Sequence, residues 1–367
     1  MIDLKQYGCE LFPTKPNSIP GRIMEHMRDR YTVMTQHGEV TASLKGTYYH
    51  SAQAQEDFPC VGDFVLLQYN PSGDSRIAEL LPRKSKFARA DFSGHAAGYV
   101  KTIHGQVVAA NFDYVFIMSS LNQDFRPSRI LRYLTQARAS GGQPVIVLTK
   151  ADLVALAPDW EYGLYEPTAL ERELHSLRQA APDVPICVVS SHTGQGLDAL
   201  GEYMQPGKTV VFLGMSGVGK SSLVNALMAA DVMAVKAIRE DDGRGRHTTT
   251  HRQLFMLPSG AMVIDTPGMR ELGLYDADEG ISASFTDVEE LFTQCRFNDC
   301  GHKTEPGCAI RAALTDGYLS PERWERYQAQ KRENRFVDDK AAYMRERRAE
   351  HKSIALYSKA KKKEAKR

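Results

Sequence analysis

The sequence predicts a multidomain protein: an N-terminal all-β barrel of the OB type over residues 20–95, a central α/β domain over 103–275, and a C-terminal helical, zinc-binding domain over 276–367. Three observations lead to this prediction. Short apolar runs alternate with turns in the first part, strands alternate with helical stretches in the second, and cysteines cluster within polar helical sequence in the third. At 367 residues, the chain is also longer than one ordinary core requires.

The composition is that of a soluble protein, with 42% hydrophobic and 25% charged residues. No apolar run approaches the roughly 20 residues that span a bilayer. The N-terminus has no basic segment followed by an apolar stretch, so it does not resemble a signal peptide. We therefore expect a cytoplasmic protein that does not associate with membranes and acts as a monomer.

The predicted barrel rests on short apolar runs separated by turn residues such as those at 70–74. These runs are Tyr31 to Met34, Glu39 to Leu44, Phe64 to Tyr69 and Ile77 to Leu81. Small barrels with basic loops often bind nucleic acid, although a barrel with a packing role alone fits this pattern as well.

A connector, Asp91 to Gly105, leads into the α/β pattern, which predicts a mainly parallel sheet with crossover helices. Strands are expected at Tyr114 to Ser119, Pro144 to Thr149 and Pro185 to Val189, and helices at Pro127 to Ser140 and Pro167 to Ala180. Beyond Asp276 no further strands are expected. A helix is predicted to start at Ser320-Pro321, where Ser caps and Pro occupies the first turn.

A phosphate-binding loop follows the apolar strand at 210–213. The pattern is GxxxxGKS, and a helix follows it: Gly214, Met215, Ser216, Gly217, Val218, Gly219, Lys220, Ser221, Ser222. Glycines permit backbone conformations in which successive N–H groups surround a phosphate at a helix N-terminus. Lys220 is expected to neutralise the β- and γ-phosphate oxygens, and Ser221 to ligate Mg²⁺.

Two further segments are expected to complete the phosphate end of the site. A strand over 262–264 ends in Asp265-Thr266-Pro267-Gly268, where Asp265 can hold a Mg²⁺-bound water and the Gly268 amide can meet the γ-phosphate. Between this strand and the phosphate loop lies a polar stretch, residues 243–251. Thr250, or otherwise Thr249, is expected to complete the Mg²⁺ shell.

A base-binding loop is predicted at Thr149, Lys150, Ala151 and Asp152, directly after an apolar strand. A carboxylate accepts bidentately from the N1–H and N2–H₂ donors of guanine, which adenine lacks. Asp152 should therefore read the base, while the stem of Lys150 packs on its face. Backbone amides near Ser190 and Ser191, at the end of the next strand, would meet guanine O6.

In an ordinary small GTPase the phosphate loop comes first in the chain and the base loops come last. Here the base loops at Thr149 and Ser190 precede the phosphate loop at Gly214. Neighbours in a sheet need not be neighbours in sequence. The same site forms if the usual N- and C-termini are joined and the domain instead ends after the DxxG sequence, Asp265 to Gly268. The sequence therefore predicts a circularly permuted G domain.

Three cysteines and one histidine form a cluster with the spacing of a metal site: Cys295, Cys300, His302 and Cys308. Three thiolates and one imidazole match a closed, tetrahedral, structural Zn²⁺ site. Reduced cysteines without metal are the alternative. The other cysteines are scattered along the chain, and no disulfides are expected.

The chain ends in a basic run, residues 359–367, although the formal net charge is only +1. Such a run is either a solvated tail or a segment that contacts RNA phosphates.

Taken together, these motifs resemble the circularly permuted GTPases, and specifically the ribosome small-subunit-dependent (RsgA, or YjeQ) family. The resemblance covers nearly the whole chain: barrel, TKAD, SSHTGQGL, GMSGVGKSSL, GRHTTT, DTPG and CxxxxCxHxxxxxC. Thr149 stands where Asn is commoner, and Ser191 where Ala is usual. The resemblance implies a GTPase in late maturation of the small (30S) ribosomal subunit, with both outer domains gripping 16S rRNA and hydrolysis timing release.

The residue that orients the attacking water cannot be the usual Gln after DxxG, because Met269 occupies that position. His247 is the best candidate, since histidine has an ordinary pKa near neutrality, and the resemblance agrees. The alternative is that His247 is simply a loop residue. Intrinsic hydrolysis should then be slow and stimulated by a partner that orders residues 240–251.

Two other functions fit parts of the sequence. One is an RNA-binding scaffold in which GTP or GDP only tunes rRNA affinity, and Met269 is compatible with it. The other is an ATP-dependent P-loop kinase, which the base loop ending in Asp152 disfavours.

Overall fold

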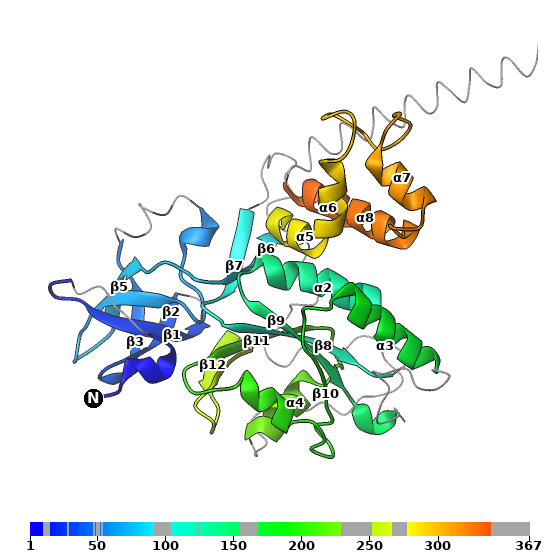
Figure 1. Cartoon of the computed structure of the whole chain (residues 1–367). Helices are drawn as coiled ribbons and strands as arrows, with labels where there is room; N and C mark the ends of the chain where they lie inside the picture. The colour runs from blue at the N-terminus through cyan, green and yellow to red at the C-terminus, as the bar shows by residue number, and fades with distance from the viewer. Residues whose placement is uncertain are drawn as a thin grey trace, which may run out of the picture. The chain divides into compact units, whose positions relative to one another are not determined.

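The structure is a computed structural model (Figure 1) that describes the chain except for residues 10–14, 28, 47, 49–51, 53, 92–103, 123–124, 155–167, 229–251, 266–276 and 339–367. It divides into two compact units. The first comprises residues 1–88 and 107–271, and the second comprises residues 89–106 and 272–367.

The N-terminal part of the first unit is a closed five-stranded barrel with the strand order β1-β2-β3-β5-β4 and a β4–β1 closure. The strands are β1 (Ile19–Met27), β2 (Arg30–Thr35), β3 (Gly38–Leu44), β4 (Phe64–Gln68) and β5 (Ser75–Leu80). Only the β3–β5 pair is parallel. Buried side chains such as Ile23, Val33 and Ile77 fill the interior. The predicted OB-type barrel is confirmed.

The remainder of the first unit is an α/β domain with the strand order β10-β9-β8-β11-β13-β12. Its strands are β8 (Tyr114–Ser120), β9 (Gln143–Thr149), β10 (Ile186–Val188), β11 (Thr209–Gly214), β12 (Arg252–Met256) and β13 (Met262–Asp265). All neighbours are parallel except β12 and β13. Since the carboxyl ends of parallel strands meet at one sheet edge, the predicted loops after Thr149 and Gly214 lie at the same edge.

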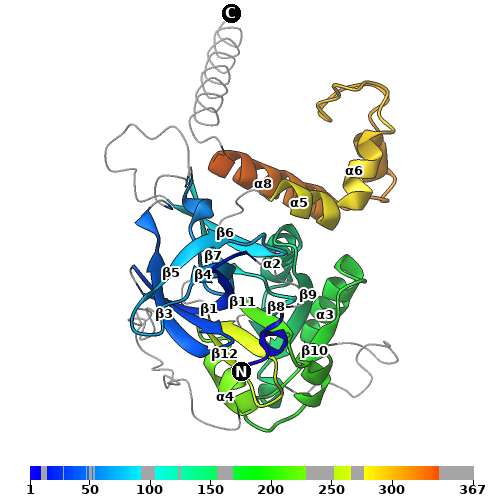
Figure 2. The same ribbon diagram turned by 90° about the vertical axis from the view of Figure 1, so that its left-hand side faces the viewer.

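Helices cover both faces of this sheet. α2 (Pro127–Ala139) and α3 (Ala169–Ala180) lie on one face, and α4 (Lys220–Met228) lies on the other (Figures 1 and 2). A core on the α4 side joins Phe116, Val147, Phe212 and Leu223. The predicted alternation of strands and helices is therefore present.

The two parts of the first unit form one continuous sheet, because β1 pairs with β12 as well as with β2 and β4. The N-terminal η1 (Leu4–Tyr7) lies beside this junction: the Tyr7 carbonyl and the Met262 side chain both contact Arg22. A second connection is the two-stranded sheet of β6 (Lys86–Asp91) and β7 (His104–Ala110).

A buried ion pair supports the start of that connection. Arg83 donates to both Asp63 oxygens at 2.8 and 2.7 Å, and also to the carbonyls of Glu56 and Phe58. Asp63 is fully buried, so Arg83 compensates a charge that burial would otherwise make costly.

The second unit, in its described residues beyond 276, contains only helices: α5 (Asp278–Ser284), α6 (Thr286–Phe292), α7 (Ala309–Thr315) and α8 (Pro321–Asp338). α8 begins where the sequence predicts, and the Ser320 hydroxyl accepts from the Arg323 amide at 3.2 Å. None of the helices in the described part of the chain has the length and apolar character needed to cross a membrane.

Candidate functional site

The predicted phosphate loop links β11 to α4 in a conformation that depends on its glycines. Gly217 and Gly219 have φ values of 77° and 93°, which L side chains rarely adopt. A Cβ at Gly214 would lie 2.6 Å from the Met118 carbonyl oxygen. The Lys220 ammonium donates to the carbonyls of Gly214 and Met215 at 2.5 and 2.7 Å, so it lies over the loop that it is predicted to serve.

The predicted base loop follows β9 and includes η4 (Ala151–Leu153). Asp152 accepts a hydrogen bond of 2.5 Å from the buried Ser190 hydroxyl, which itself accepts from the amides of His192 and Thr193. This bond, first among several causes, lowers the pKa of Asp152 below its ordinary value. The carboxylate is thus held ionised and oriented, as an acceptor for guanine requires.

The base loop and the phosphate loop are joined by one side chain. Thr149 is 1% exposed, and its hydroxyl lies 2.6 Å from the Val218 carbonyl oxygen and 3.4 Å from that of Ser119. A hydroxyl has one proton to donate, so the shorter contact is the effective hydrogen bond. The structure therefore brings Asp152 and the phosphate loop together, although their order in the chain is reversed.

Asp265 ends β13 at the same edge of the sheet. Burial raises the pKa of Asp265, and the nearby Lys220 opposes that shift. A half-buried carboxyl beside a lysine is suited to a cation-binding role. The other residues predicted for this end of the site lie outside the described residues: His247, Thr249, Thr250, Gly268 and Met269.

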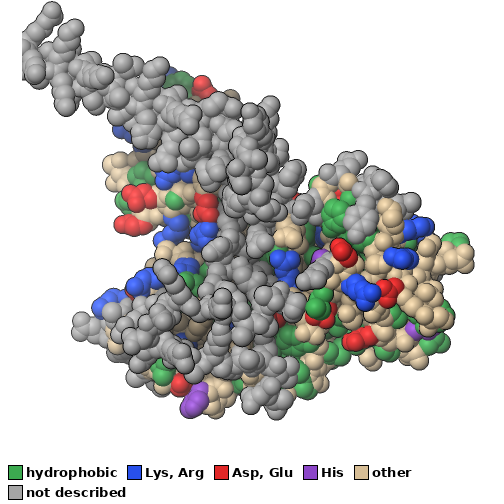
Figure 3. Space-filling view, turned by 180° about the vertical axis from the view of Figure 1, so that it is seen from behind, with side chains coloured by type: hydrophobic (Ala, Val, Ile, Leu, Met, Phe, Trp, Pro, Cys, Tyr) green, Lys and Arg blue, Asp and Glu red, His purple; other side chains and the backbone are tan. Residues whose placement is uncertain are grey.

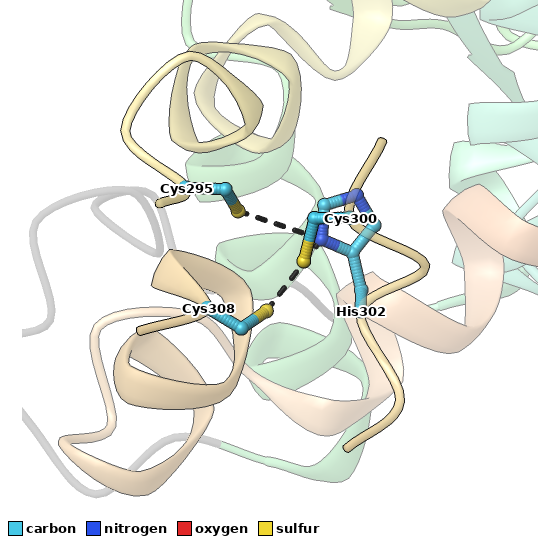
Figure 4. Close-up of side chains that lie close together, drawn as sticks. All are labelled: Cys295, Cys300, His302 and Cys308. Carbon is cyan, nitrogen blue, oxygen red and sulfur yellow. Dashed lines mark hydrogen bonds between the residues drawn. The ribbon is translucent and has the colours of Figure 1, made fainter. Parts of the chain in front are cut away.

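The four predicted metal ligands converge in the second unit (Figure 4), where their ligand atoms all lie within 4.8 Å of one another. The His302 Nδ1 lies 3.6 Å from the Cys295 sulfur and 3.5 Å from the Cys308 sulfur. A tetrahedral Zn²⁺ holds sulfur and nitrogen ligands about 3.6 Å apart. Burial lowers the pKa of His302, which favours the neutral imidazole that binds metals. The cluster could hold zinc.

The loop that carries these ligands is ordered by Glu305, a residue that sequence reasoning did not identify. Its carboxylate accepts from the amides of Gly301, Lys303 and Thr304, and such amide bonds lower the pKa of Glu305 to about 2. His302 has a φ of 56°, an uncommon value for a residue other than glycine. The surrounding amide bonds help to hold that conformation.

Comparison with known proteins identifies the family. Residues 80–275 match the model of the RsgA GTPase family. The chain is 45% identical over 337 residues to the small ribosomal subunit biogenesis GTPase RsgA 2 of Lactiplantibacillus plantarum, covering 90% of this chain and 89% of that protein. It is 42% identical over 320 residues to the RsgA of Streptomyces avermitilis, covering 87% and 80%. The chain belongs to the RsgA GTPase family.

Two solved structures share the fold of this chain. YjeQ from Thermotoga maritima aligns with a TM-score of 0.59 at 26% identity, covering 85% of this chain and 96% of YjeQ. YloQ, described as a circularly permuted GTPase, aligns with a TM-score of 0.55 at 23% identity, covering 86% and 94%. The predicted permuted G domain is confirmed, and membership of the RsgA family makes the chain a GTP-hydrolysing enzyme.

The structure adds two features that sequence reasoning missed in the base loop. The Ser190 amide already donates to the Gln195 carbonyl at 2.9 Å, and the Ser190 hydroxyl orients Asp152. Leu153, next to Asp152, is 64% exposed. A leucine directly after the aspartate could have been noticed as a possible apolar contact for the base, but the Ser190 contact spans 38 residues and has no local signal.

Proposed function

We propose that this GTPase binds the small (30S) ribosomal subunit and acts in its late maturation, hydrolysing GTP to GDP and phosphate with stimulation by the subunit. Relatives of similar length are named small ribosomal subunit biogenesis GTPases. The observation that carries the proposal is the Thr149–Val218 hydrogen bond, which joins the loop of Asp152, the carboxylate that would read guanine, to the phosphate loop.

GTP would lie along the carboxyl edge of the sheet. Asp152 reads the guanine, Lys150 packs on its face, and backbone amides near Ser190 and Ser191 would meet guanine O6. The phosphate loop, from Gly214 to Ser222, surrounds the β-phosphate. Lys220 would leave its two carbonyl acceptors to bind phosphate oxygens, which are stronger acceptors because they are charged.

Mg²⁺ fits beside these residues. Ser221 at the start of α4 and Asp265 at the end of β13 are oxygen donors, and Thr250 or Thr249 would complete the set. Mg²⁺ held by these residues would supply the positive charge that offsets the charge developing on the phosphate oxygens. The half-buried Asp265 carboxyl, whose pKa burial raises, would be stabilised by a cation.

Hydrolysis requires that water attack the γ-phosphorus while the bond to the bridging oxygen breaks and GDP leaves with the electron pair. We assign the water's proton to His247 and a γ-phosphate contact to the Gly268 amide. Met269 carries no group that could orient the water. His247 is therefore the proposed catalytic residue.

One structural Zn²⁺ would occupy the Cys295, Cys300, His302 and Cys308 cluster. All four ligand positions come from the protein, so no open position is available for a catalytic water. Zinc would therefore stabilise the fold of the second unit and take no part in the reaction.

Contacts with 16S rRNA would come from the barrel and the zinc-binding domain. On the face shown in Figure 3, described Lys and Arg side chains are interspersed with Asp and Glu, so charge alone selects no single RNA-binding face there. The basic run 359–367 would add phosphate contacts. We propose domains at 20–95, 103–275 and 276–367, and a cytoplasmic monomer.

Multiple-turnover GTP hydrolysis, measured with and without purified small subunits, tests this proposal. We expect slow intrinsic turnover and strong stimulation by the subunits. Binding to subunits that changes with nucleotide while turnover stays unstimulated would favour the scaffold function instead. Co-sedimentation with subunits in GTP-analogue and GDP states provides the binding measurement, and equal affinity in both states would argue against nucleotide-timed release.

A further inference from the structure

Strand β1 belongs both to the barrel and to the sheet of the G domain. It pairs with β2 and β4 inside the barrel, and its C-terminal half pairs with β12 of the G domain through Glu25–Gln253 and His26–Arg252. The barrel thus occupies the β12 side of the G-domain sheet. Because backbone hydrogen bonds fix both register and spacing, a displacement of β1 must displace β12.

The strand pairing continues from β12 to β13, which ends at the phosphate end of the site. Gln253 pairs with Glu25 on one side and with Asp265 on the other. The three residues therefore form one row across three strands, with Asp265 about 10 Å from the barrel residue Glu25. In contrast, the strands that carry the base loop and the phosphate loop, β9 and β11, do not pair with β1.

Arg22 fixes β1 at this junction. Its side chain is buried, and it donates to the carbonyls of Tyr7, Gly62 and Asn111 at 2.6, 3.3 and 2.8 Å. Its Nη1 atom also lies 3.3 Å from the sulfur of Met262, the first residue of the strand that ends at Asp265.

The main chain around the Arg22 side chain is closely packed, so β1 has little freedom to move there. Gly62 has a φ of 91°, and a Cβ there would lie 2.1 Å from the Ala110 carbonyl oxygen. The Ala110 amide donates to the Val61 carbonyl at 3.1 Å, and Asn111 has a φ of 55°. Barrel and G domain therefore meet through main-chain contacts on both sides of Arg22.

We propose that Arg22 is a positioning residue for GTP hydrolysis: by fixing β1 against β12 and β13, it fixes the Asp265 carboxylate relative to the phosphate loop. The inference rests on the proposed GTPase function and extends it to the barrel, which becomes part of the hydrolytic machinery. Nucleotide affinity depends on β9 and β11, so Arg22 should influence turnover more than binding.

The test compares Arg22→Met with Arg76→Met, without ribosomal subunits. Arg76 is an exposed arginine of the same barrel whose side chain contacts Ser43. The concentration of active sites is determined by GDP titration. We expect Arg22→Met to lower kcat by about tenfold to a hundredfold with KM within about twofold, as small misplacements of catalytic groups do. Arg76→Met should match the wild type, and Arg22→Lys should recover part of kcat.

Amide hydrogen exchange of β12 and β13 provides the second measurement. Arg22→Met should accelerate exchange at 252–256 and 262–265, whereas Arg76→Met should not. Unchanged kcat, or kcat and affinity lost together in the active fraction, would overturn the proposal. If Arg22→Met does not fold, Arg22→Lys is judged by the same kcat and exchange criteria.

If the proposed function is wrong, the experiment gives a different result from the one that overturns the role of Arg22. In that case the wild-type chain itself would not hydrolyse GTP. Exchange then tests only the contact on which the proposal depends: faster exchange of β12 and β13 in the variant shows that Arg22 holds these strands, and exchange equal to that of Arg76→Met shows that it does not.

Discussion

The hydroxyl of Thr149 donates a 2.6 Å hydrogen bond to the carbonyl oxygen of Val218, and so joins the end of β9 to the phosphate loop. The two residues are 69 positions apart and both are buried. The bond fixes one peptide of the loop, and with it the direction of neighbouring N–H groups. One side chain thereby couples the guanine end of the site to the phosphate end.

Replacing Thr149 by valine should therefore weaken nucleotide binding. The isosteric change removes the donor and leaves the buried Val218 carbonyl without it, a cost of about 1–2 kcal/mol. GDP and GTP affinities should each fall by roughly 5- to 30-fold, with kcat little changed. Fluorescent-GDP titration measures the effect. Thr149→Ser keeps the hydroxyl and should bind nearly as the wild type does; equal losses in both variants would assign the effect to packing.

Guanine binding should be insensitive to pH across the neutral range. The Ser190 hydrogen bond lowers the pKa of Asp152, so the carboxylate stays ionised and its contribution is lost only as pH falls through that lowered pKa. The contribution of Asp152 to GDP affinity should thus be unchanged from about pH 8 to about pH 5.

Ser190→Ala removes this bond, so the pKa of Asp152 rises and the loss of GDP affinity on acidification should begin at higher pH than in the wild type. Ser191→Ala, at the next residue, is the control. The measurement is GDP titration at a series of pH values, on variants shown to be folded by circular dichroism. Superimposable pH profiles of GDP affinity for the two variants would exclude this role for Ser190.

The strands and helices of the α/β domain could be predicted because their signals are local. The expected strand at 144–149 and helix at 127–140 correspond to β9 and α2, which have strong periodicity and clear boundaries. The sequence pattern does not predict strand β1. Pro20, Arg22 and Glu25 interrupt its apolar pattern, and the burial of Arg22 is compensated by carbonyls up to 89 residues away.

The same division applies to the site. Asp152, Lys220 and the four clustered metal ligands could be predicted from motifs, because each motif encodes a short loop with its own backbone requirements. The contacts of Thr149 with Val218 and of Ser190 with Asp152 could not, because they depend on which strand ends meet at the sheet edge. The contacts by which Thr149 and Ser190 orient the site were therefore found only in the structure.

The assignment of the proton acceptor can be tested directly. His247→Ala should retain GDP and GTP affinity within about twofold, because the phosphate and base loops are unchanged, and should lose subunit-stimulated turnover by about a hundredfold or more. His251→Ala, in the same stretch of sequence, is the matched control. Single-turnover hydrolysis with small subunits separates chemistry from product release. Stimulated turnover equal to the wild type in His247→Ala would remove His247 from the mechanism.

Removing zinc should unfold the second unit while leaving nucleotide binding intact. Trp324 reports this change, because its ring lies 5.9 Å from that of His302, and Trp160→Phe leaves Trp324 as the single tryptophan. A strong chelator should shift the Trp324 emission to longer wavelength and reduce the helical circular dichroism signal, since metal binding in small domains supplies folding free energy.

GDP affinity should change by less than about twofold on zinc removal, because the predicted nucleotide-binding residues all lie in the first unit. Cys300→Ser should have the same effect as the chelator and lower the zinc content. Cys187→Ser, which changes a cysteine in β10 of the first unit, should keep a full complement of zinc. A chelated protein with native Trp324 emission would show that the four side chains hold their arrangement without metal.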